Sequence, residues 1–413
     1  VSEIRSIDEN KFCIPKLTSI KIENSNDMFN NKIYINIPNI KSQIPIFVIF
    51  KLFGCLTDKE ILYNIIDNSS AEIDSLMTKI LLPSFNNSKD VRNEKDAYDV
   101  IFDNLNVNLK VLPYDKKIDY INENIINNIL PHIKNKKDKV LYLGLMINKL
   151  IKCVLNIDKV ADRDSYIHKR IETPGVLLGN ITYLCYNKIF KDCKTSIQNI
   201  FSTNIFVEKS DIIDETNLNK LFKPIYLETT LKSSLATGNW GIKNNTQNNK
   251  SGVSQVLNRL TYASNISHLR RISSGGDITG KLIPPRKLHA TSWGYICPSE
   301  TPEGAAIGLV KNISNSCEIT HQYSSEPVRY IIKDYIIDID EIDLFQYDKT
   351  SNIKVLINGC WIGFSENIEL LMKVLKDNRD NGKINIYISF YIDYINSILY
   401  IYTYRGRCIR PLL

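Results

Sequence analysis

Residues 267–312 read SHLRRISSGGDITGKLIPPRKLHATSWGYICPSETPEGAAIGLVKN, and this stretch is the most informative part of the chain. It combines adjacent arginines, a glycine-rich loop, a second basic cluster behind two prolines and a Thr-Pro-Glu-Gly turn. From Gly238 to Ser299 there are eight Lys or Arg residues and a single acid, Asp277. A surface with this local excess of positive charge attracts polyphosphates, of which nucleic acid is the commonest in cells. The stretch therefore predicts contact with nucleic acid.

The composition of the whole chain is that of a multidomain globular protein. At 413 residues and 43% hydrophobic content, the chain is long enough for more than one ordinary core. The net charge of +7 is only mildly basic, so the local cluster is the stronger argument. The N-terminus lacks the apolar core of a signal peptide, and lysines interrupt the longest apolar runs, 44–55 and 140–155. We expect a soluble intracellular protein that is a fragment of a longer one.

The residue types of metal and hydrolase sites are present without the necessary spacing. None of the nine cysteines forms a C-x-x-C pair, which argues against a zinc knuckle and favours free thiols in a reducing compartment. The five histidines are scattered, and no Ser/His/Asp set or pair of carboxylates is evident. We expect no metal site and no catalytic residue within the chain.

Local patterns predict several elements outside the opening stretch. Residues 16–40 alternate apolar and polar side chains, as paired strands do. The apolar run 44–55 predicts a buried segment, followed by a helix that begins near Thr57-Asp58, and 140–155 predicts a strongly apolar helix. Ser365 is predicted to cap a short helix through Leu375, ended by the Asn381-Gly382 turn.

Three further predictions concern the basic stretch. Gly238-Asn239-Trp240-Gly241 and the Asn-rich residues after it predict a mobile loop rather than a core element. Thr301-Pro302-Glu303-Gly304 predicts a helix start, with Thr301 as N-cap and an apolar helix through Val310. Val256-Leu257 and Ile266 are predicted to be hydrophobic anchors.

The adjacent arginines Arg270 and Arg271 cannot share one face of a helix or strand. At most one therefore points at a given ligand, where its planar guanidinium would suit phosphate oxygens. We expect the other to pair with a buried acid and hold the loop.

Three segments of this region resemble the fork of the second-largest subunit of multisubunit RNA polymerases, of the eukaryotic, archaeal or large-DNA-virus type. They are SGVSQVLNRLTYASNISHLRR (251–271), PPRKLHATSWGYICPSETPEG (284–304) and GLVKN (308–312). The resemblance implies an α+β multidomain fold made of four regions. These are a lobe-like region (1–163), the return segment of an incomplete protrusion (164–231), the fork (232–322) and a truncated first external domain (323–413).

The resemblance also implies a function and a set of partners. The parent complex would be a DNA-directed RNA polymerase, with this chain positioning the RNA–DNA hybrid and the downstream DNA fork. Mg²⁺ would be bound mainly by the largest subunit, so this chain alone would be inactive. The implied partners are the largest and smaller subunits, template DNA, nascent RNA and nucleoside triphosphates, with no membrane. The implied location is the nucleus or, for a virus, a viral factory or virion in the cytoplasm.

The resemblance and the residue chemistry together select candidate contacts with nucleic acid or the active centre. They are Gln255, Arg259, His268, Arg270, Arg271, Lys281, Arg286, His289 and Glu303. For Arg286, a structural salt bridge is an equally good interpretation. The chain departs from the family pattern at Ile278, where a basic residue is usual, and at Ala305, where a polar one is usual.

Two other classes of function remain open on sequence grounds. A stand-alone nucleic-acid-binding module would use the same basic cluster. A catalytically degenerate paralogue would act as a structural partner of the transcription machinery, and the departures at Ile278 and Ala305 favour it slightly.

Overall fold

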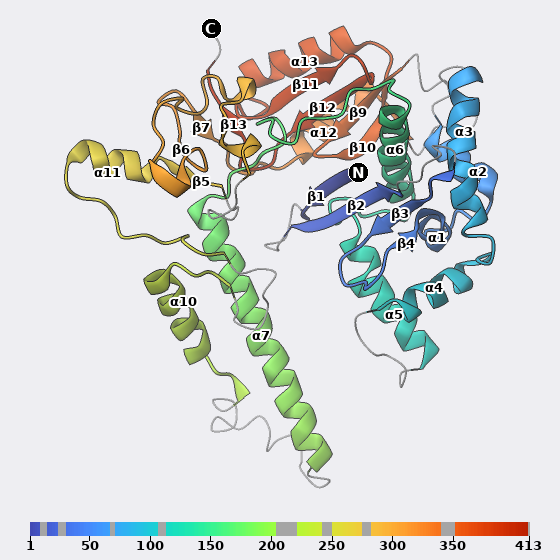
Figure 1. Ribbon diagram of the computed structural model, residues 1–413, viewed down its shortest axis with the longest axis horizontal. Coiled ribbons are helices and arrows are strands. Elements are labelled where there is room, and N and C mark those ends of the chain that lie inside the picture. Colours follow the sequence, from blue (N-terminus) through green and yellow to red (C-terminus); the bar gives the residue numbers. More distant parts are fainter. Residues whose placement is uncertain are drawn as a thin grey trace. The chain divides into compact units, whose positions relative to one another are not determined.

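The computed structural model describes residues 1–8, 15–23, 30–66, 71–105, 113–203, 221–241, 250–274, 282–339 and 352–411 (Figure 1). The chain forms two compact units, and each is made of segments distant in sequence. Unit 1 comprises Val1–Ala161 and His321–Arg405, and unit 2 comprises Asp162–Thr320 and Gly406–Leu413.

The first part of unit 1 is a small antiparallel sheet with helices packed against it. Its strands, in the order β1-β2-β3-β4, are Ser2–Ser6, Lys16–Ile22, Ile33–Asn36 and Ile44–Pro45. The pairing of β2 with β3 confirms the strands predicted from the alternation in 16–40. The helices are α1 (Ile46–Leu52), α2 (Asp58–Ile65), α3 (Ala71–Asn86), α4 (Glu94–Asp103), α5 (Tyr114–Asn124) and α6 (Lys136–Val154).

Local chemistry explains where these helices begin and how closely they pack. Every residue of α1 is buried, as the apolar run predicted. Thr57 and Glu60 form a reciprocal capping box at the start of α2, which confirms the predicted helix start. Helix α6 confirms the apolar helix and crosses α2 at Gly144, where a Cβ would lie 2.1 Å from the carbonyl oxygen of Asn64. Only glycine permits this approach.

The second part of unit 1 is a five-stranded sheet in the order β11-β12-β9-β10-β8. All neighbours are antiparallel except β12 and β9, which are parallel. Helices α12 and α13 pack on strands of this sheet to form one apolar core. The bounds are β8 (Ile337–Asp338), β9 (Ile353–Ile357), β10 (Cys360–Ser365), β11 (Ser389–Asp393), β12 (Ile398–Tyr402), α12 (Glu326–Ile332) and α13 (Ile368–Asp380).

The predicted cap of α13 was wrong by two residues. Ser365 is still paired with Ile353 in β10, so its backbone is committed to the sheet. Asn367 caps the helix instead, and its side chain accepts a hydrogen bond from the Leu370 amide at 3.0 Å. The predicted ending at Asn381-Gly382 is confirmed, with Gly382 at φ +73°.

Unit 2 combines two packed helices with a small set of short strands. Helix α7 (Pro174–Thr203) lies beside α10 (Ile225–Thr237), as Figure 1 shows. The remaining elements are α11 (Tyr262–Leu269), β5 (Arg271–Ser273), β6 (Val310–Asn312), β7 (Glu318–Ile319) and β13 (Cys408–Ile409). Strand β5 pairs with β6, and β7 pairs with β13, both antiparallel.

The loop predicted from Gly238 onward is partly a core element. Gly238 ends α10 in the left-handed conformation. Trp240, however, is only 8% exposed and packs with Ile181 and Cys185 of α7. Its indole Nε1 donates to the Ser254 hydroxyl at 2.8 Å. The large indole surface outweighs the local Gly and Asn signal, and residues 242–249 lie outside the described part.

Within the described residues, none of the helices combines the length and apolar character needed to span a membrane.

Candidate nucleic-acid interface

Residues 301–310 form a turn and a strand rather than the predicted helix. A 3-10 turn covers Gly304–Ala306, and the chain then joins β6 at Val310. The Thr301 hydroxyl accepts from the Gly308 amide at 2.9 Å and donates to the Val310 carbonyl at 3.0 Å. The side chain that would cap a helix instead closes a loop, because β6 is held by its pairing with β5. The helix prediction was therefore wrong.

The adjacent arginines diverge in the structure. Arg270 turns inward, and its Nη2 donates to the Ser314 carbonyl at 2.5 Å. Arg271 begins β5 and is exposed, without a hydrogen bond or ion pair among the described residues. The expectation that one arginine holds the loop is confirmed, but its hydrogen-bond partner is a carbonyl oxygen rather than a buried acid.

Arg286 is also held from within the chain. Its Nη1 donates to the carbonyls of Ala305 at 2.6 Å and Ile307 at 2.9 Å, and its Nε donates to Leu282 at 3.2 Å. Its backbone lies against Gly308, where a Cβ would come within 2.3 Å of the Arg286 carbonyl oxygen. Arg286 thus ties the proline-stiffened turn to the loop after Glu303. These three bonds are all to carbonyl oxygens.

Gln255 and His268 contact each other directly. Gln255 Oε1 accepts from His268 Nε2 at 2.9 Å, while His268 Nδ1 accepts from the Asn258 amide at 3.0 Å. Because Nδ1 is an acceptor here, the ring proton lies on Nε2. The pair fixes the segment before α11 to that helix.

The hydrophobic anchors predicted nearby are wrong for two of the three residues. Val256 is 95% exposed and Ile266 is 39% exposed, whereas Leu257 is partly buried. Helix α11 has no buried residue. Polar contacts, not apolar burial, hold this part of unit 2 within the described chain.

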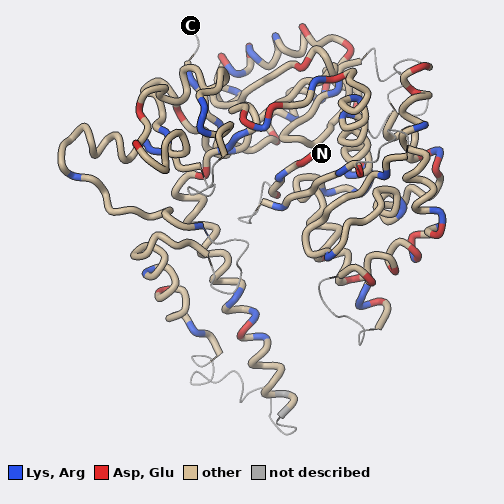
Figure 2. Tube along the Cα trace, in the orientation of Figure 1, with Lys and Arg blue, Asp and Glu red and all other residues tan. Residues whose placement is uncertain are grey.

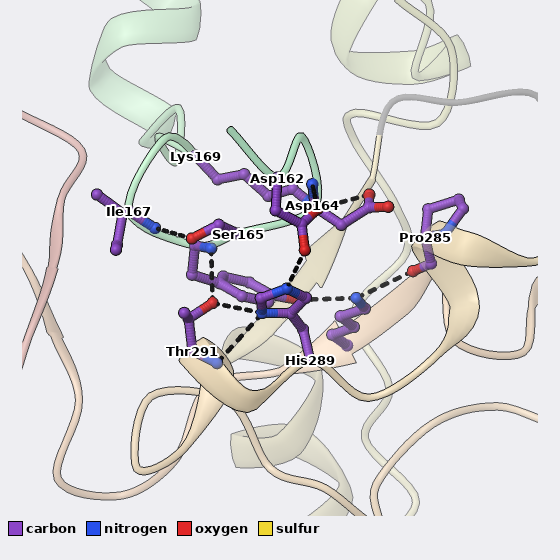
Figure 3. A network of polar contacts seen from close by, with 10 residues as sticks. Asp162, Asp164, Ser165, Ile167, Lys169, Pro285, His289 and Thr291 are labelled. Carbon is purple, nitrogen blue, oxygen red and sulfur yellow. Dashed lines mark hydrogen bonds and ion pairs between the residues drawn. The ribbon is translucent and has the colours of Figure 1, made fainter. Parts of the chain in front are cut away.

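His289 is the centre of the polar network in Figure 3. Its Nε2 donates to Asp162 Oδ2 at 2.7 Å, and its Nδ1 accepts from the Thr291 hydroxyl at 2.7 Å. Thr291 Oγ1 in turn accepts from the Tyr166 amide at 2.9 Å. The hydrogen bond from His289, followed by that from the Asp164 amide, holds the pKa of Asp162 below its usual range. His289 therefore faces an acid of this chain.

Lys311 extends the same network to β6. Its Nζ donates to the Tyr166 hydroxyl at 2.8 Å and to the Pro285 carbonyl at 3.2 Å. The ammonium also lies 5.3 Å from the centre of the Tyr166 ring. Burial lowers the pKa of Lys311. Residues 162–166 thereby brace both the turn after Pro284 and the strand after Gly308.

Sequence reasoning missed Asp162, Tyr166 and Lys311 as parts of this site. Asp162 and Tyr166 precede α7, and Lys311 lies far beyond it in the chain, so no local pattern joins them. The available signals were the D-R-D run at 162–164 and the GLVKN run at 308–312, which lie more than 140 residues apart in the sequence.

The remaining candidates point outward or are not described. Arg259 is exposed and has no polar partner in the described chain, and Lys287 is exposed after the 3-10 turn Pro284–Arg286. Glu303 is exposed at the start of its turn and makes no capping hydrogen bond. Lys281 and Ile278 lie outside the described residues.

The charges of this region remain one-sided. Residues 238–241, 250–274 and 282–299 include no Asp or Glu. Figure 2 marks Lys and Arg in blue and Asp and Glu in red along the chain. Among all residues that the structure describes, no group of three or more His, Cys, Asp or Glu could hold a metal ion. The described part of this region therefore offers cations to an anionic partner.

Comparison with known families finds three matches in consecutive order. Residues 5–172 match "RNA polymerase Rpb2, domain 2", residues 255–319 match domain 3, and residues 355–413 match domain 4. The bracing network thus joins the end of the domain 2 match, at Asp162 and Tyr166, to residues 285–311 within the domain 3 match.

Individual relatives align over nearly the whole chain. DNA-directed RNA polymerase II subunit 2 of Arabidopsis thaliana is 33% identical over all of this chain and 34% of its own length. DNA-directed RNA polymerase II subunit RPB2 of Meyerozyma guilliermondii is 32% identical over all of this chain and 32% of its own. DNA-directed RNA polymerase subunit 2 of Acanthamoeba polyphaga mimivirus is 30% identical over 99% of this chain and 35% of its own. The chain spans about a third of these relatives.

Proposed function

The chain belongs to the family of RNA polymerase second-largest subunits, and on that premise we propose that it positions nucleic acid within a DNA-directed RNA polymerase. The whole enzyme would copy DNA by adding nucleotides to RNA, and this chain would hold the RNA–DNA hybrid and the downstream DNA fork. The ordered matches to domains 2, 3 and 4 support this assignment. The four regions expected at 1–163, 164–231, 232–322 and 323–413 are part of the proposal.

The observation that carries the proposed mechanism is a repeated arrangement of cations. In each dibasic pair the first arginine is held by backbone carbonyls, through Ser314 for Arg270 and through Ala305 and Ile307 for Arg286. The second residue, Arg271 or Lys287, is exposed. An anchored residue fixes the backbone from which its neighbour projects. The exposed cation can then meet a phosphate with less loss of conformational freedom.

The other candidate residues also divide into those that are exposed and those that are held by contacts within the chain. Arg259 joins Arg271 and Lys287 as an outward cation, and Glu303 is an outward acid. Gln255 and His268 support the segment that carries Arg259, and His289 supports the turn that carries Lys287. We assign the first group to direct contact and the second to positioning.

The chemistry of the enzyme would require Mg²⁺ from outside this chain. On the resemblance to the family, we assign this ion mainly to the largest subunit. That subunit, the smaller subunits, template DNA, nascent RNA and nucleoside triphosphates are the proposed partners. The eukaryotic relatives favour the nucleus, and the mimivirus relative favours a viral compartment as the alternative.

Purification of the full-length protein from its source tests this function. The co-purifying proteins are identified by mass spectrometry, and the preparation is assayed for templated nucleotide incorporation. Recovery of a largest subunit with template-dependent RNA synthesis supports the proposal. Recovery with polymerase subunits but without synthesis would favour the degenerate paralogue, and recovery alone with nucleic-acid binding would favour the stand-alone module.

A further inference from the structure

Trp293 is an exposed tryptophan in the positively charged part of unit 2. It is 80% exposed, whereas the other two tryptophans of the chain, Trp240 and Trp361, are 8% and 5% exposed. Both buried indoles donate their Nε1 hydrogen, to the Ser254 hydroxyl at 2.8 Å and to the Gly363 carbonyl at 3.1 Å. The indole of Trp293 makes no hydrogen bond within the described residues. Since tryptophan has the largest apolar surface of any side chain, an indole left in solvent is a candidate binding surface.

The backbone that carries Trp293 is held on both sides. The Trp293 amide donates to the Ala290 carbonyl at 3.2 Å. The Ser292 carbonyl accepts from the Ile296 amide at 3.1 Å, and both of these residues are buried. The exposed indole therefore extends from a fixed turn. It can bind a flat partner without first ordering its own backbone, which reduces the entropy lost on binding.

An arginine from the end of the chain is fixed beside the residue that follows Trp293. Gly294 has a φ of +78°, and a Cβ there would lie 2.1 Å from Nη1 of Arg410, so the guanidinium lies directly against this backbone. The guanidinium is also 5.5 Å from the centre of the Tyr295 ring. Within the described residues it makes neither a hydrogen bond nor an ion pair, and its Nε is buried without a partner. Arg410 is thus a half-buried cation whose charge is not neutralised by the described chain.

The acids around Trp293 and Arg410 are few. Residues 282–299 contain none, and Glu300, the next acid along the chain, accepts a hydrogen bond from the Ser267 hydroxyl. Glu318 lies opposite Ile409 across the pair of β7 and β13, and it forms no ion pair with Arg410 in the described structure. An exposed aromatic ring close to unpaired cations is the combination with which proteins bind single-stranded nucleic acid. The local excess of positive charge favours such a polyanion over a protein surface.

We propose that Trp293 and Arg410 form a subsite for one unpaired nucleotide, with its base stacked on the indole and its phosphate bound by the guanidinium. This subsite rests on the proposed function and adds to it a contact with a base, whereas Arg259, Arg271 and Lys287 are assigned to phosphates. A base inside a duplex has both faces covered by its neighbours, so only an unpaired base can stack on the indole. The subsite accepts any of the bases, because every base has a π-face.

Photochemical cross-linking of the full-length protein in its purified complex tests the subsite. The probe is a DNA–RNA scaffold that carries 5-iodouracil at one position at a time, in the template strand, the non-template strand or the RNA. Irradiation joins iodouracil to an aromatic side chain on which it stacks, and peptide mapping identifies that residue. We expect a cross-link to Trp293 from an unpaired position and no such cross-link from paired positions. The strand that gives the cross-link identifies the source of the nucleotide.

Affinity measurements on variants separate stacking from charge. Trp293→Ala should weaken binding of a labelled single-stranded oligonucleotide about tenfold without changing the slope of log affinity against log salt concentration. Trp293→Phe keeps an aromatic face and should recover most of the affinity. Arg410→Gln should flatten the slope by about 0.7, the contribution of one phosphate on a single strand, in protein whose circular dichroism is unchanged. Arg410→Lys keeps the charge and should keep the slope.

Tyr394→Ala is the matched control for the aromatic substitution. Tyr394 is 77% exposed and lies in unit 1, so its removal takes away an exposed ring without touching the proposed subsite. The control should leave both the affinity and the salt slope unchanged.

The subsite and the proposed function can fail separately. Binding of the scaffold without a cross-link at Trp293, together with unchanged affinity in Trp293→Ala, would overturn the subsite and leave the proposed function standing. Failure of the unaltered protein to bind the scaffold at all would refute the proposed function and the subsite with it. Protection of Trp293 from hydroxyl radicals in the complex before nucleic acid is added would show that another subunit covers the ring, which would also overturn the subsite.

Discussion

The outward cations Arg259, Arg271 and Lys287 make a quantitative prediction about salt. Each phosphate neutralised on duplex DNA contributes about −0.9 to the slope of log affinity against log salt concentration. Three contacts contribute about −2.7, and changing all three residues to Gln should flatten the slope by up to that amount. The loss of affinity should be greatest at low salt, where release of counterions is most favourable.

The residues for this test are chosen by whether their side chains are exposed or already hydrogen-bonded within the chain. From the sequence alone, Arg270 and Arg286 were as good candidates as Arg271. Their guanidinium groups already donate to carbonyls of the chain. Substituting them would disturb the loops and confuse loss of folding with loss of a contact. Arg259, Arg271 and Lys287 are exposed, so their replacement removes charge with little effect on packing.

The assay is fluorescence anisotropy of a labelled DNA–RNA scaffold with the full-length protein over a series of salt concentrations. A control variant carries Lys373→Gln, Lys376→Gln and Lys383→Gln, which remove the same charge from exposed positions in and after α13 of unit 1. The control should leave the slope unchanged. An unaltered slope in the Arg259, Arg271 and Lys287 variant, or an equal change in both variants, would refute the assignment of direct contacts.

Three further predictions concern stability. Gly144→Ala should destabilise unit 1 by about 2 kcal/mol or more, because its Cβ would clash with the backbone of Asn64, and urea unfolding measures this. Burial lowers the pKa of His132 from 6.5 to about 4, so the unfolded chain binds a proton on this ring more tightly than the folded protein does. The free energy of unfolding is therefore unaffected by this group above pH 6.5 and decreases as the pH falls toward 4; by linkage the decrease approaches about 3 kcal/mol. His132→Phe should therefore show a smaller drop in urea midpoint than the parent between pH 7 and pH 4, and an equal drop would contradict the assignment. Thr301→Val keeps the shape but removes both hydrogen bonds of the hydroxyl, and it should cost about 1–3 kcal/mol in the same measurement. An unchanged midpoint for Thr301→Val would show that the turn is held by other contacts.

The sequence predicted elements whose signals are local. The capping box at Thr57 and Glu60 lies within one helical turn, and every residue of α1, which lies in the apolar run 44–55, is buried. The strands in 16–40 pair across a short connection. In each case the residues that determine the element are close together in the chain, so the pattern alone was sufficient.

Predictions failed where a distant partner decided between two local possibilities. Thr301 has the chemistry of an N-cap, but its hydroxyl closes a loop because β6 pairs with β5. Ser365 and Asn367 are both good caps, and the pairing of Ser365 with β9 leaves the role to Asn367. Trp240 lies in a loop-like sequence and is buried by α7. These choices depend on tertiary contacts that no short window contains.

In the candidate site, too, the sequence predicted which residue types are present but not where their side chains lie. Sequence could name a dense set of cations and could argue that neighbouring arginines must diverge. It could not say which arginine turns inward, because that depends on the Ser314 carbonyl and on the strands around it. Nor could it place Asp162 against His289, or Lys311 against Tyr166.

The arginines that are held by backbone carbonyls reduce the conformational freedom that the neighbouring exposed cations must lose on binding a phosphate. A lysine or arginine on a free loop must lose backbone and side-chain freedom to meet a phosphate at a defined position. Here the hydrogen bonds of Arg270 and Arg286 and the network around His289 have already fixed the backbone next to Arg271 and Lys287. Binding then has to order only the outward side chains. A high density of positive charge and a rigid fold are thus parts of one arrangement, in which about half of the basic residues hold the surface that the others present.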